Sequence, residues 1–166
     1  MSSNTGNDGY LGNPLLKKSN QEIEWTPELL AEYMKCANDV VYFTETYMKI
    51  INVDEGLVPF KLYDYQKDML HSFQNNRNTI VTTARQAGKS TTTCAFILWY
   101  VLFNKEVNVA LLANKGDTAR EILGRIQTAY QHLPKWLQQG IKEWNKGSLW
   151  LENDSRIIAA ATSASG

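Results

Sequence analysis

The 166-residue sequence has few of the residues that build covalent or metal-bound scaffolds, since it holds two cysteines and two histidines. Cys36 and Cys94 are far apart, and each lies in an apolar pattern typical of a helix, which favours reduced thiols in a core. His71 and His132 stand alone, without a cluster of cysteines and histidines around them. We therefore expect neither a disulfide framework nor a structural zinc site.

The sequence also lacks an excess of either charge and lacks a long apolar run. Its 17 basic and 17 acidic residues cancel, which argues against a strongly basic protein that coats DNA but allows a local basic patch. The apolar run at residues 96–103 is too short to span a bilayer, and the N-terminus has no basic-then-apolar signal pattern. These absences predict a soluble cytoplasmic protein with no membrane partner.

What the sequence does contain is a phosphate-loop pattern between a predicted strand and a predicted helix. Residues 79–83 are β-branched, which predicts a buried strand. Residues 90–104 hold an apolar run that begins at Cys94 and contain no Gly or Pro, which predicts a buried helix. The connection ends in the Gly-Lys-Ser triplet of a phosphate-binding loop and reads Ala84, Arg85, Gln86, Ala87, Gly88, Lys89, Ser90. One position departs from the consensus, because Thr83 stands where a first glycine is expected.

The residue types of this loop suit a nucleotide polyphosphate with Mg²⁺. Gly88 allows the backbone to turn so that successive N–H groups point into one concavity. Lys89 can reach the β and γ phosphates, and the Ser90 hydroxyl can complete the coordination shell of Mg²⁺. The helix that begins near Lys89 adds unpaired N–H donors and the positive end of its dipole. We therefore predict a nucleotide site at this loop.

The rest of the chain predicts an α/β fold behind an N-terminal arm. Residues 1–24 are rich in Ser, Asn and Gly, and we expect a flexible arm that docks through Leu11, Leu15 and Leu16. A buried strand at residues 107–113 would complete a βαβ unit with residues 79–83, within a mostly parallel sheet flanked by helices. The other expected elements are helices at 26–37, 40–50, 62–73 and 117–132, a loop at 51–61, a turn and short helix at 133–137, and a hairpin of 148–152 with 156–161.

The sequence after the loop lacks the carboxylates that a nucleotide hydrolase needs. None of the acids after Ser90 ends an apolar strand of four residues; these acids are Glu106, Asp117, Glu121, Glu143, Glu152 and Asp154. Asp117 comes nearest to the required pattern, and only loosely. We therefore expect residues 25–166 to form an incomplete domain that stops before its acidic, metal-supporting strand.

Five stretches together resemble the large terminase subunit of tailed bacteriophages, above all the T-even type, an ATP-driven motor that packages DNA into proheads. They are residues 39–47, 62–70, 84–91, 111–116 and 141–148, and the likeness covers residues 26–166. The form Arg-Gln-x-Gly-Lys is this family's own variant of the loop, which accounts for Thr83. The resemblance implies a phosphate-loop NTPase fold, here the first part of an N-terminal ATPase domain without the family's later Asp, catalytic Glu and nuclease domain.

The resemblance also implies roles for single residues. Arg85 resembles an arginine finger that contacts the γ-phosphate from within the subunit, and Lys89 and Ser90 resemble the phosphate and Mg²⁺ ligands. Gln66 resembles a glutamine that recognises adenine, with Tyr65 covering the ring. The implied cofactors are ATP and Mg²⁺, and the implied nucleotide-binding set is Tyr65, Gln66, Ala84, Arg85, Gln86, Ala87, Gly88, Lys89, Ser90 and Thr91.

The partners that the resemblance implies are double-stranded DNA, the portal protein, the small terminase subunit and other copies of the chain. The implied location is the host cytoplasm, docked on the prohead portal, and we expect this chain alone to bind ATP without efficient turnover. A fragment of a helicase-like translocase and a nucleotide-binding or assembly module that does not hydrolyse remain alternatives. Trp136, Trp144 and Trp150 are compatible with a stacking surface for single-stranded nucleic acid and, more simply, with packing against the sheet.

Overall fold

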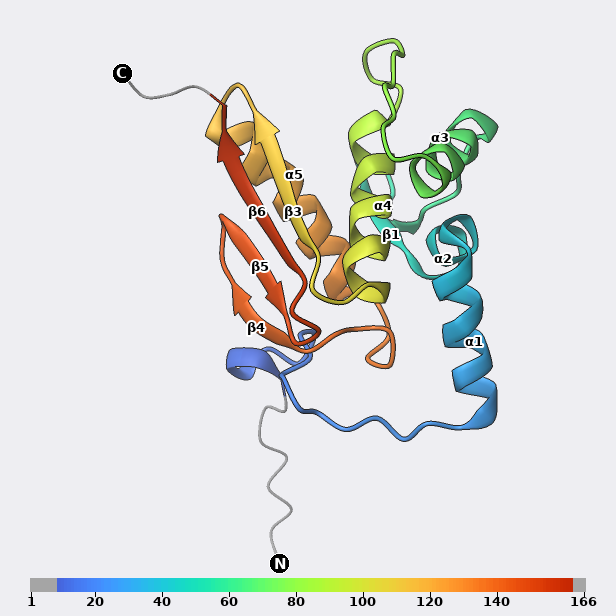
Figure 1. Ribbon diagram of the computed structural model, residues 1–166, viewed down its shortest axis with the longest axis vertical. Helices are drawn as coiled ribbons and strands as arrows, with labels where there is room; N and C mark the ends of the chain where they lie inside the picture. Colours follow the sequence, from blue (N-terminus) through green and yellow to red (C-terminus); the bar gives the residue numbers. More distant parts are fainter. Residues whose placement is uncertain (1–8, 163–166) are drawn as a thin grey trace, which may run out of the picture.

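The computed structural model describes residues 9–162, in which a group of helices stands beside a four-stranded sheet (Figure 1). The helices are η1 (Tyr10–Gly12), α1 (Pro27–Asn38), α2 (Val40–Tyr47), α3 (Asp64–Asn75), α4 (Lys89–Phe103) and α5 (Gly116–Gln131). The strands are β1 (Lys49–Asn52), β2 (Gly56–Pro59), β3 (Asn108–Ala113), β4 (Ile141–Trp144), β5 (Ser148–Leu151) and β6 (Arg156–Ala161). Within residues 9–162, none of these helices has the length and apolar character to cross a bilayer.

The sheet is mixed, with the strand order β3-β6-β5-β4. Only β3 and β6 run parallel, with Val109 opposite Ile157, while β6–β5 and β5–β4 are antiparallel. The predicted hairpin is therefore confirmed, but the prediction of a mostly parallel sheet is wrong. The reason is local: a turn of four residues between β5 and β6 can only return the chain antiparallel, and the same holds for the short connection between β4 and β5.

Residues 79–83 do not form the strand that their β-branched composition predicts. Ile80 is 94% exposed, and the segment belongs to the loop that rises beyond the start of α4, apart from β3 (Figure 1). A β-branched segment becomes a strand only where another strand offers hydrogen-bond partners and a face to bury against. No described strand pairs with this segment, so the predicted βαβ unit of residues 79–113 is wrong.

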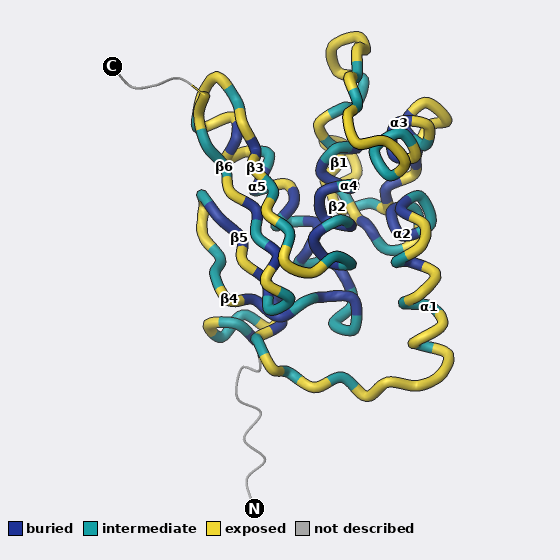
Figure 2. The backbone as a smooth tube through the Cα atoms, in the orientation of Figure 1, coloured by how far each residue is buried: buried dark blue, intermediate teal, exposed yellow. Residues whose placement is uncertain are grey.

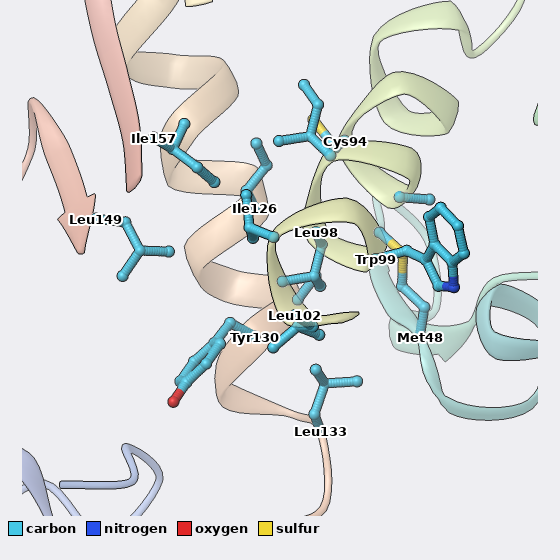
Figure 3. Close-up of a cluster of buried hydrophobic side chains, with 14 of the residues drawn as sticks. Met48, Cys94, Leu98, Trp99, Leu102, Ile126, Tyr130, Leu133, Leu149 and Ile157 are labelled. Atoms are coloured by element: carbon cyan, nitrogen blue, oxygen red, sulfur yellow. The ribbon is translucent and has the colours of Figure 1, made fainter. Parts of the chain in front are cut away.

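The core is layered from the sheet through α5 to α4. Side chains of β5 and β6 meet one side of α5, and side chains of α4 meet the other (Figure 3). Helix α4 is apolar around most of its circumference because its far side packs against α2 and α3. Trp99 anchors that side by donating its Nε1–H to the carbonyl of Cys36 at 2.8 Å. The helix that follows the phosphate loop is therefore held between two layers of helix.

Three smaller expectations about the chain also need correction. The helix expected at residues 40–50 ends at Tyr47, because Lys49 already pairs with Pro59 in a β1–β2 hairpin. That hairpin occupies the region expected to be a loop, and Gly56 supplies a left-handed φ of 75° at its tip. Residues 133–137 contain a turn but no helix.

The segment at residues 15–20 is tied to the sheet side of the molecule (Figure 2). Leu16 is buried, and Gln138 accepts a hydrogen bond from the Lys17 N–H at 2.9 Å. The Gln138 amide also donates to the carbonyls of Leu15, Tyr130 and Leu133. Of the leucines expected to dock, Leu16 does so and Leu11 is exposed. The division into an arm at residues 1–24 and a domain at residues 25–166 stays a prediction, and residues 1–8 lie outside the described residues.

Both cysteines are reduced and buried, as expected. Burial raises the pKa of each thiol to about 12. At neutral pH both therefore behave as small apolar core groups.

Candidate functional site

The predicted phosphate loop connects the extended segment at residues 76–83 to the first turn of α4. Gly88 is the residue before the helix and has a left-handed φ of 70°. Gln86 also adopts a left-handed φ, of 62°, which costs a residue with a side chain about 1 kcal/mol. Two left-handed residues within three positions give the loop the sharp reversals that aim backbone N–H groups toward one side.

The Lys89 side chain folds back onto the backbone just before the loop and at its start. Its Nζ donates to the carbonyl oxygens of Thr83 at 3.1 Å and Ala84 at 2.9 Å. An ammonium group is thereby surrounded by loop carbonyls at the position where phosphate oxygens are expected. Since those carbonyls carry only partial charges, a polyphosphate is a stronger partner for the same ammonium.

The remaining loop side chains face solvent. Arg85 and Ser90 are exposed, and Arg85 makes no ion pair within residues 9–162. The alternative of a structural ion pair for Arg85 therefore has no support. Thr92 and Thr93 donate their hydroxyls to the carbonyls of Gly88 and Lys89, which closes the first turn of α4 behind the loop.

The head of α3 lies against this loop. Tyr65 donates its hydroxyl to the carbonyl of Ala87 at 2.7 Å. Gln66 is 4% exposed, and its Nε2 lies 2.7 Å from the position that a Cβ on Gly88 would occupy. Glycine at position 88 thus suits both the left-handed φ and the close approach of the Gln66 amide, which would have to shift if a Cβ were added. The alternative of a solvated Gln66 is excluded, because its amide is packed beneath the loop.

The Gln66 amide already has a partner on its acceptor side. Its Oε1 accepts a hydrogen bond from the Tyr63 N–H at 2.9 Å, which caps the start of α3. Bidentate reading of an adenine edge uses both the oxygen and the nitrogen of an amide. Because an amide oxygen can accept two hydrogen bonds, Oε1 keeps one acceptor position beside the cap.

A cavity of about 530 Å³ joins the loop to the head of α3. Its walls come from three places: the β1–β2 hairpin, the start of α3 and the phosphate loop. The residues on these walls include Ile50, Val58, Phe60, Tyr63, Tyr65, Gln66, Gln86, Ala87, Gly88 and Thr91. The volume suits a nucleotide or part of one.

Sequence reasoning missed the hairpin wall of this cavity. Gly56 and Pro59 are typical loop signals, and neither Lys49–Asn52 nor Gly56–Pro59 shows the polar–apolar alternation that would indicate a strand. A larger cavity of about 630 Å³ lies on the other side of β1, between α4 and α5. It contains none of the loop residues from 84 to 90, so we place the candidate site at the smaller one.

The acids that follow Ser90 are used elsewhere in the fold. Asp117 and Glu121 form ion pairs with Arg120 and Arg125 along α5, at 2.5 Å and 2.7 Å. Glu143 accepts hydrogen bonds from Ser148 and Asn145. Glu152 forms an ion pair with Lys17, and Asp154 forms one with Lys142. Glu106 follows the far end of α4.

The residues of the loop fit ATP with Mg²⁺ on the phosphate side. Lys89 and the turned backbone suit the phosphates, and the exposed Ser90 hydroxyl suits one position of a Mg²⁺ shell. Within residues 9–162 no group of three or more His, Cys, Asp or Glu side chains could hold a metal by itself. A Mg²⁺ ion at this loop would therefore depend on phosphate oxygens and water for most of its ligands.

The three tryptophans of the alternative nucleic-acid surface do not share a face. Trp136 packs edge-on against Tyr47, with ring centroids 5.3 Å apart, and Trp144 packs against Tyr130 at 5.6 Å. Trp150 lies between the cations of Lys142 and Arg156, at 5.2 Å and 5.6 Å from its ring centroid. The arrangement favours packing for these rings over a stacking surface.

Comparison with known proteins identifies a matching family and solved structures of similar fold. The family described as "Terminase large subunit, T4likevirus-type, N-terminal" matches residues 80–166, which is more than half of the chain. One of these structures is described as "Crystal structure of the HK97 bacteriophage large terminase"; it is similar in fold, with a TM-score of 0.62 and 19% identity. The similarity covers 78% of this chain and 28% of that chain.

Proposed function

Because the chain belongs to the T4-type family of large terminase subunits, of which it matches the N-terminal region, we propose that it forms the ATP-binding part of a viral DNA-packaging motor. In this proposal the complete motor hydrolyses ATP and translocates double-stranded DNA into a prohead. Its partners are the portal protein, the small terminase subunit and other copies of the chain, and it works in the host cytoplasm on the prohead portal. These activities belong to complete large terminase subunits, and the similarity to the HK97 large terminase covers 28% of the length of that chain.

One observation carries the ATP-binding proposal: the phosphate loop and the head of α3 border a single cavity and contact each other. Tyr65 reaches the Ala87 carbonyl, and Gln66 packs against Gly88. A ligand in this cavity meets the aromatic and amide groups of Tyr63, Tyr65 and Gln66 at one end and the loop backbone from Gln86 to Gly88 at the other. Lys89 does not line the cavity, but it follows Gly88 directly as the first residue of α4. That division suits the base and the phosphates of one nucleotide.

In this proposal different residues of the loop bind different parts of the phosphate chain and its Mg²⁺ ion. Lys89 exchanges the carbonyls of Thr83 and Ala84 for the β and γ phosphate oxygens. Ser90 contributes its hydroxyl to Mg²⁺, and Arg85, exposed beside the loop, is placed to contact the terminal phosphate. ATP itself supplies the phosphoanhydride bond whose cleavage drives the motor.

We further propose that this chain binds ATP without efficient turnover. Five of the six acids after Ser90 have structural partners, and Glu106 follows the end of α4 opposite the loop. A helix of fifteen residues is about 22 Å long, which removes Glu106 from the phosphates. None of the described acids that follow Ser90 is therefore placed to orient or deprotonate water at the phosphates. Among the described residues that precede the loop, Glu55 lines the cavity that borders it. The placement of the later acids keeps a non-hydrolysing nucleotide-binding module as the second candidate.

The test is thermal stabilisation of the 166-residue chain by ATP and by ADP with Mg²⁺, compared with Lys89→Ala. At a ligand concentration about 100 times Kd, binding adds about 2.7 kcal/mol, or a rise in Tm of roughly 6 °C. Lys89→Ala should abolish this rise and leave the Tm of the free protein unchanged within about 1 °C. Lys105→Ala, an exposed lysine beyond the other end of α4, is the matched control and should behave as the parent.

Two results would contradict the proposal. Equal stabilisation of the parent and Lys89→Ala would place the nucleotide elsewhere. Rapid ATP hydrolysis by the pure chain, lost with Lys89, would mean that a water-activating group is present after all. Portal-stimulated hydrolysis by a longer chain that continues past Gly166 would separate a packaging motor from a helicase-like translocase.

A further inference from the structure

The β1–β2 hairpin leaves backbone hydrogen-bonding groups of β1 pointing away from β2. The two strands are antiparallel, with Lys49 opposite Pro59. The Phe60 N–H donates to the Met48 carbonyl at 2.9 Å, so hydrogen-bonded and non-hydrogen-bonded pairs alternate along the ladder from that point. Lys49 and Ile51 fall in the non-hydrogen-bonded pairs, and their N–H and C=O groups therefore point to the open edge of β1.

The outer edge of β2 is protected, whereas the outer edge of β1 is not. On β2, Pro59 has no N–H, and its carbonyl accepts the Lys61 N–H at 3.1 Å. On β1, the backbone groups of Lys49 and Ile51 have no hydrogen-bond partner within the described part of the chain. An unpaired strand edge is a template for a further strand. The edge of β1 can therefore accept an extended backbone.

This open edge forms one wall of the larger cavity, which has a volume of about 630 Å³ and is bordered on its other sides by α4 and α5. The four consecutive residues 48–51 line the wall. A strand presents consecutive residues to one side only along its edge, because each of its faces carries alternate residues. The smaller cavity shows the contrast, since the β1 residues that line it are Ile50 and Asn52. The larger cavity thus lies beside the unpaired edge.

Gly124 opens the wall of this cavity that α5 provides. It lies inside a helix, where glycine is less favourable than alanine. A Cβ built on Gly124 would meet nothing within 4 Å, so no neighbour within the described residues requires glycine there. Glycine at such a position allows another backbone to approach closely.

The charges around the cavity favour an acidic occupant. Two basic side chains, Lys49 and Arg125, and one acid, Glu121, line it. Glu121 is already paired with Arg125 at 2.7 Å, and Lys49 has no ion pair within residues 9–162. A carboxylate placed opposite Lys49 would complete a cross-strand pair of opposite charges.

A second copy of this chain offers a poor match to the edge. Residues 79–83 have the composition of a strand and lack a strand partner, but they contain no acid and are flanked by Arg77 and Arg85. Like charges would meet if this segment lay beside Lys49 and Arg125, which disfavours the pairing. The charge pattern therefore points to another protein.

We propose that the open edge of β1 is a docking site for an extended, acidic peptide segment of a partner protein, which adds to the hairpin as a third strand between α4 and α5. The segment runs antiparallel to β1, the more stable pairing for a short strand. It places a carboxylate opposite Lys49 and an apolar residue opposite Ile51, whose side chain is 69% exposed. Main-chain hydrogen bonds supply the affinity, and the two side-chain pairs supply the selectivity.

The experiment is an NMR titration of the 166-residue chain with the peptide acetyl-Thr-Val-Thr-Glu-Thr-amide, combined with amide hydrogen exchange. In the free chain, the amides of Lys49 and Ile51 should exchange faster than the amide of Ile50, which is bonded to β2. Saturating peptide should slow exchange at Lys49 and Ile51 about tenfold or more and leave Ile50 unchanged. The same peptide with Lys in place of Glu should bind about threefold more weakly.

Two pairs of variants test the edge and the cavity separately. Ile51→Pro removes the outward N–H and should weaken the peptide about tenfold, whereas Ile51→Val keeps that N–H and should bind within about twofold of the parent. Gly124→Ala should weaken binding about threefold, and Gly124→Leu, which fills the cavity, should abolish it. The Val58 amide, bonded to Ile50, should stay protected from exchange in all four variants and report an intact hairpin.

Several results would overturn the inference. One is the absence of saturable binding up to a peptide concentration of about 5 mM. Others are unchanged affinity in both Ile51→Pro and Gly124→Leu, and binding without protection of the Lys49 and Ile51 amides. Protection of those amides in the free chain that disappears on dilution would assign the edge to a second copy. None of these readouts involves ATP, so their failure would leave the proposed nucleotide site untouched.

Discussion

The sheet side of the molecule and the phosphate loop satisfy their polar groups in opposite ways. Near the sheet, Gln138 binds residues from 15 to 133, so a buried amide joins parts of the chain that are far apart in sequence. At the loop, Lys89 binds carbonyls only five and six residues away. Long-range contacts form and break with the whole fold, whereas local contacts can open by themselves. The loop can therefore rearrange around a ligand without weakening the sheet.

The strongest test of this difference compares two isoleucines that the sequence placed in strands. Ile157 is fully buried in β6, and Ile80 is 94% exposed. Ile157→Ala should lower the free energy of unfolding by about 3 kcal/mol because it removes a buried side chain and leaves a cavity. Ile80→Ala should change it by less than about 0.5 kcal/mol. Urea unfolding of both variants measures the difference, and a similar loss in each would mean that residues 79–83 are packed as a strand.

A smaller change in stability is expected from protonation of Glu152, whose carboxylate bonds the N-terminal segment to the sheet side of the molecule. Burial raises the pKa of this carboxyl, but the N–H groups of Asn20 and Gly140, with Lys17, outweigh it and hold the pKa below the ordinary value of 4.5. A folded-state pKa below the unfolded value stabilises the protein above pH 4.5, and the contribution is lost as the pH falls through the folded value. The sheet side should therefore lose part of its stability in acid.

The measurement is the difference in unfolding free energy between the parent and Glu152→Gln. This difference should be about 1.5 kcal/mol near pH 7 and should shrink as the pH falls below 4.5 and through the folded-state pKa. Glu24→Gln, an exposed acid with no hydrogen bond in the structure, is the control and should show no difference at either pH. A difference that stays constant with pH would assign the effect of Glu152→Gln to packing.

The smallest effect on stability is expected for Gly88→Ala, a variant that should nevertheless have a large effect on ATP binding. Gly88→Ala should cost about 1 kcal/mol of stability because φ is positive there. The new Cβ would also push the Gln66 amide from its place under the loop, so stabilisation by ATP should disappear. Gly124→Ala in α5 is the matched control, since nothing lies within 4 Å of its added Cβ and alanine favours a helix by up to about 1 kcal/mol. Retained ATP stabilisation in Gly88→Ala would contradict the role of this contact.

Periodicity and capping residues predicted the helices well. Thr26 and Pro27 marked the start of α1, where the Thr26 hydroxyl accepts the Leu29 N–H at 3.2 Å. The apolar run before Asn104 predicted α4, and the polar turn at residues 152–155 predicted the β5–β6 hairpin. These signals depend only on residues close together in the sequence, so they can be recognised without knowing which elements pack together in the fold.

Features that depend on a distant partner were not predictable. Residues 79–83 have the composition of a strand, but a strand also needs a neighbouring strand to pair with, and composition does not show whether one is present. The sequence indicated Gln66 and the loop as site residues, while the bond between Gln66 and the Tyr63 N–H and the stacked rings of Tyr63 and Tyr65 appear only in the structure. The hairpin wall of the cavity was missed because its two strands have four residues each.

The depth at which Cys36 and Cys94 lie makes the chain convenient to label. Both thiols are buried with pKa values near 12, so maleimide or iodoacetamide reagents meet almost no thiolate at neutral pH. A cysteine introduced as Ile80→Cys would then be the one reactive thiol among residues 9–162. A fluorophore attached there would report the movement of the phosphate loop on addition of nucleotide. The native cysteines would not be labelled and would add no background signal.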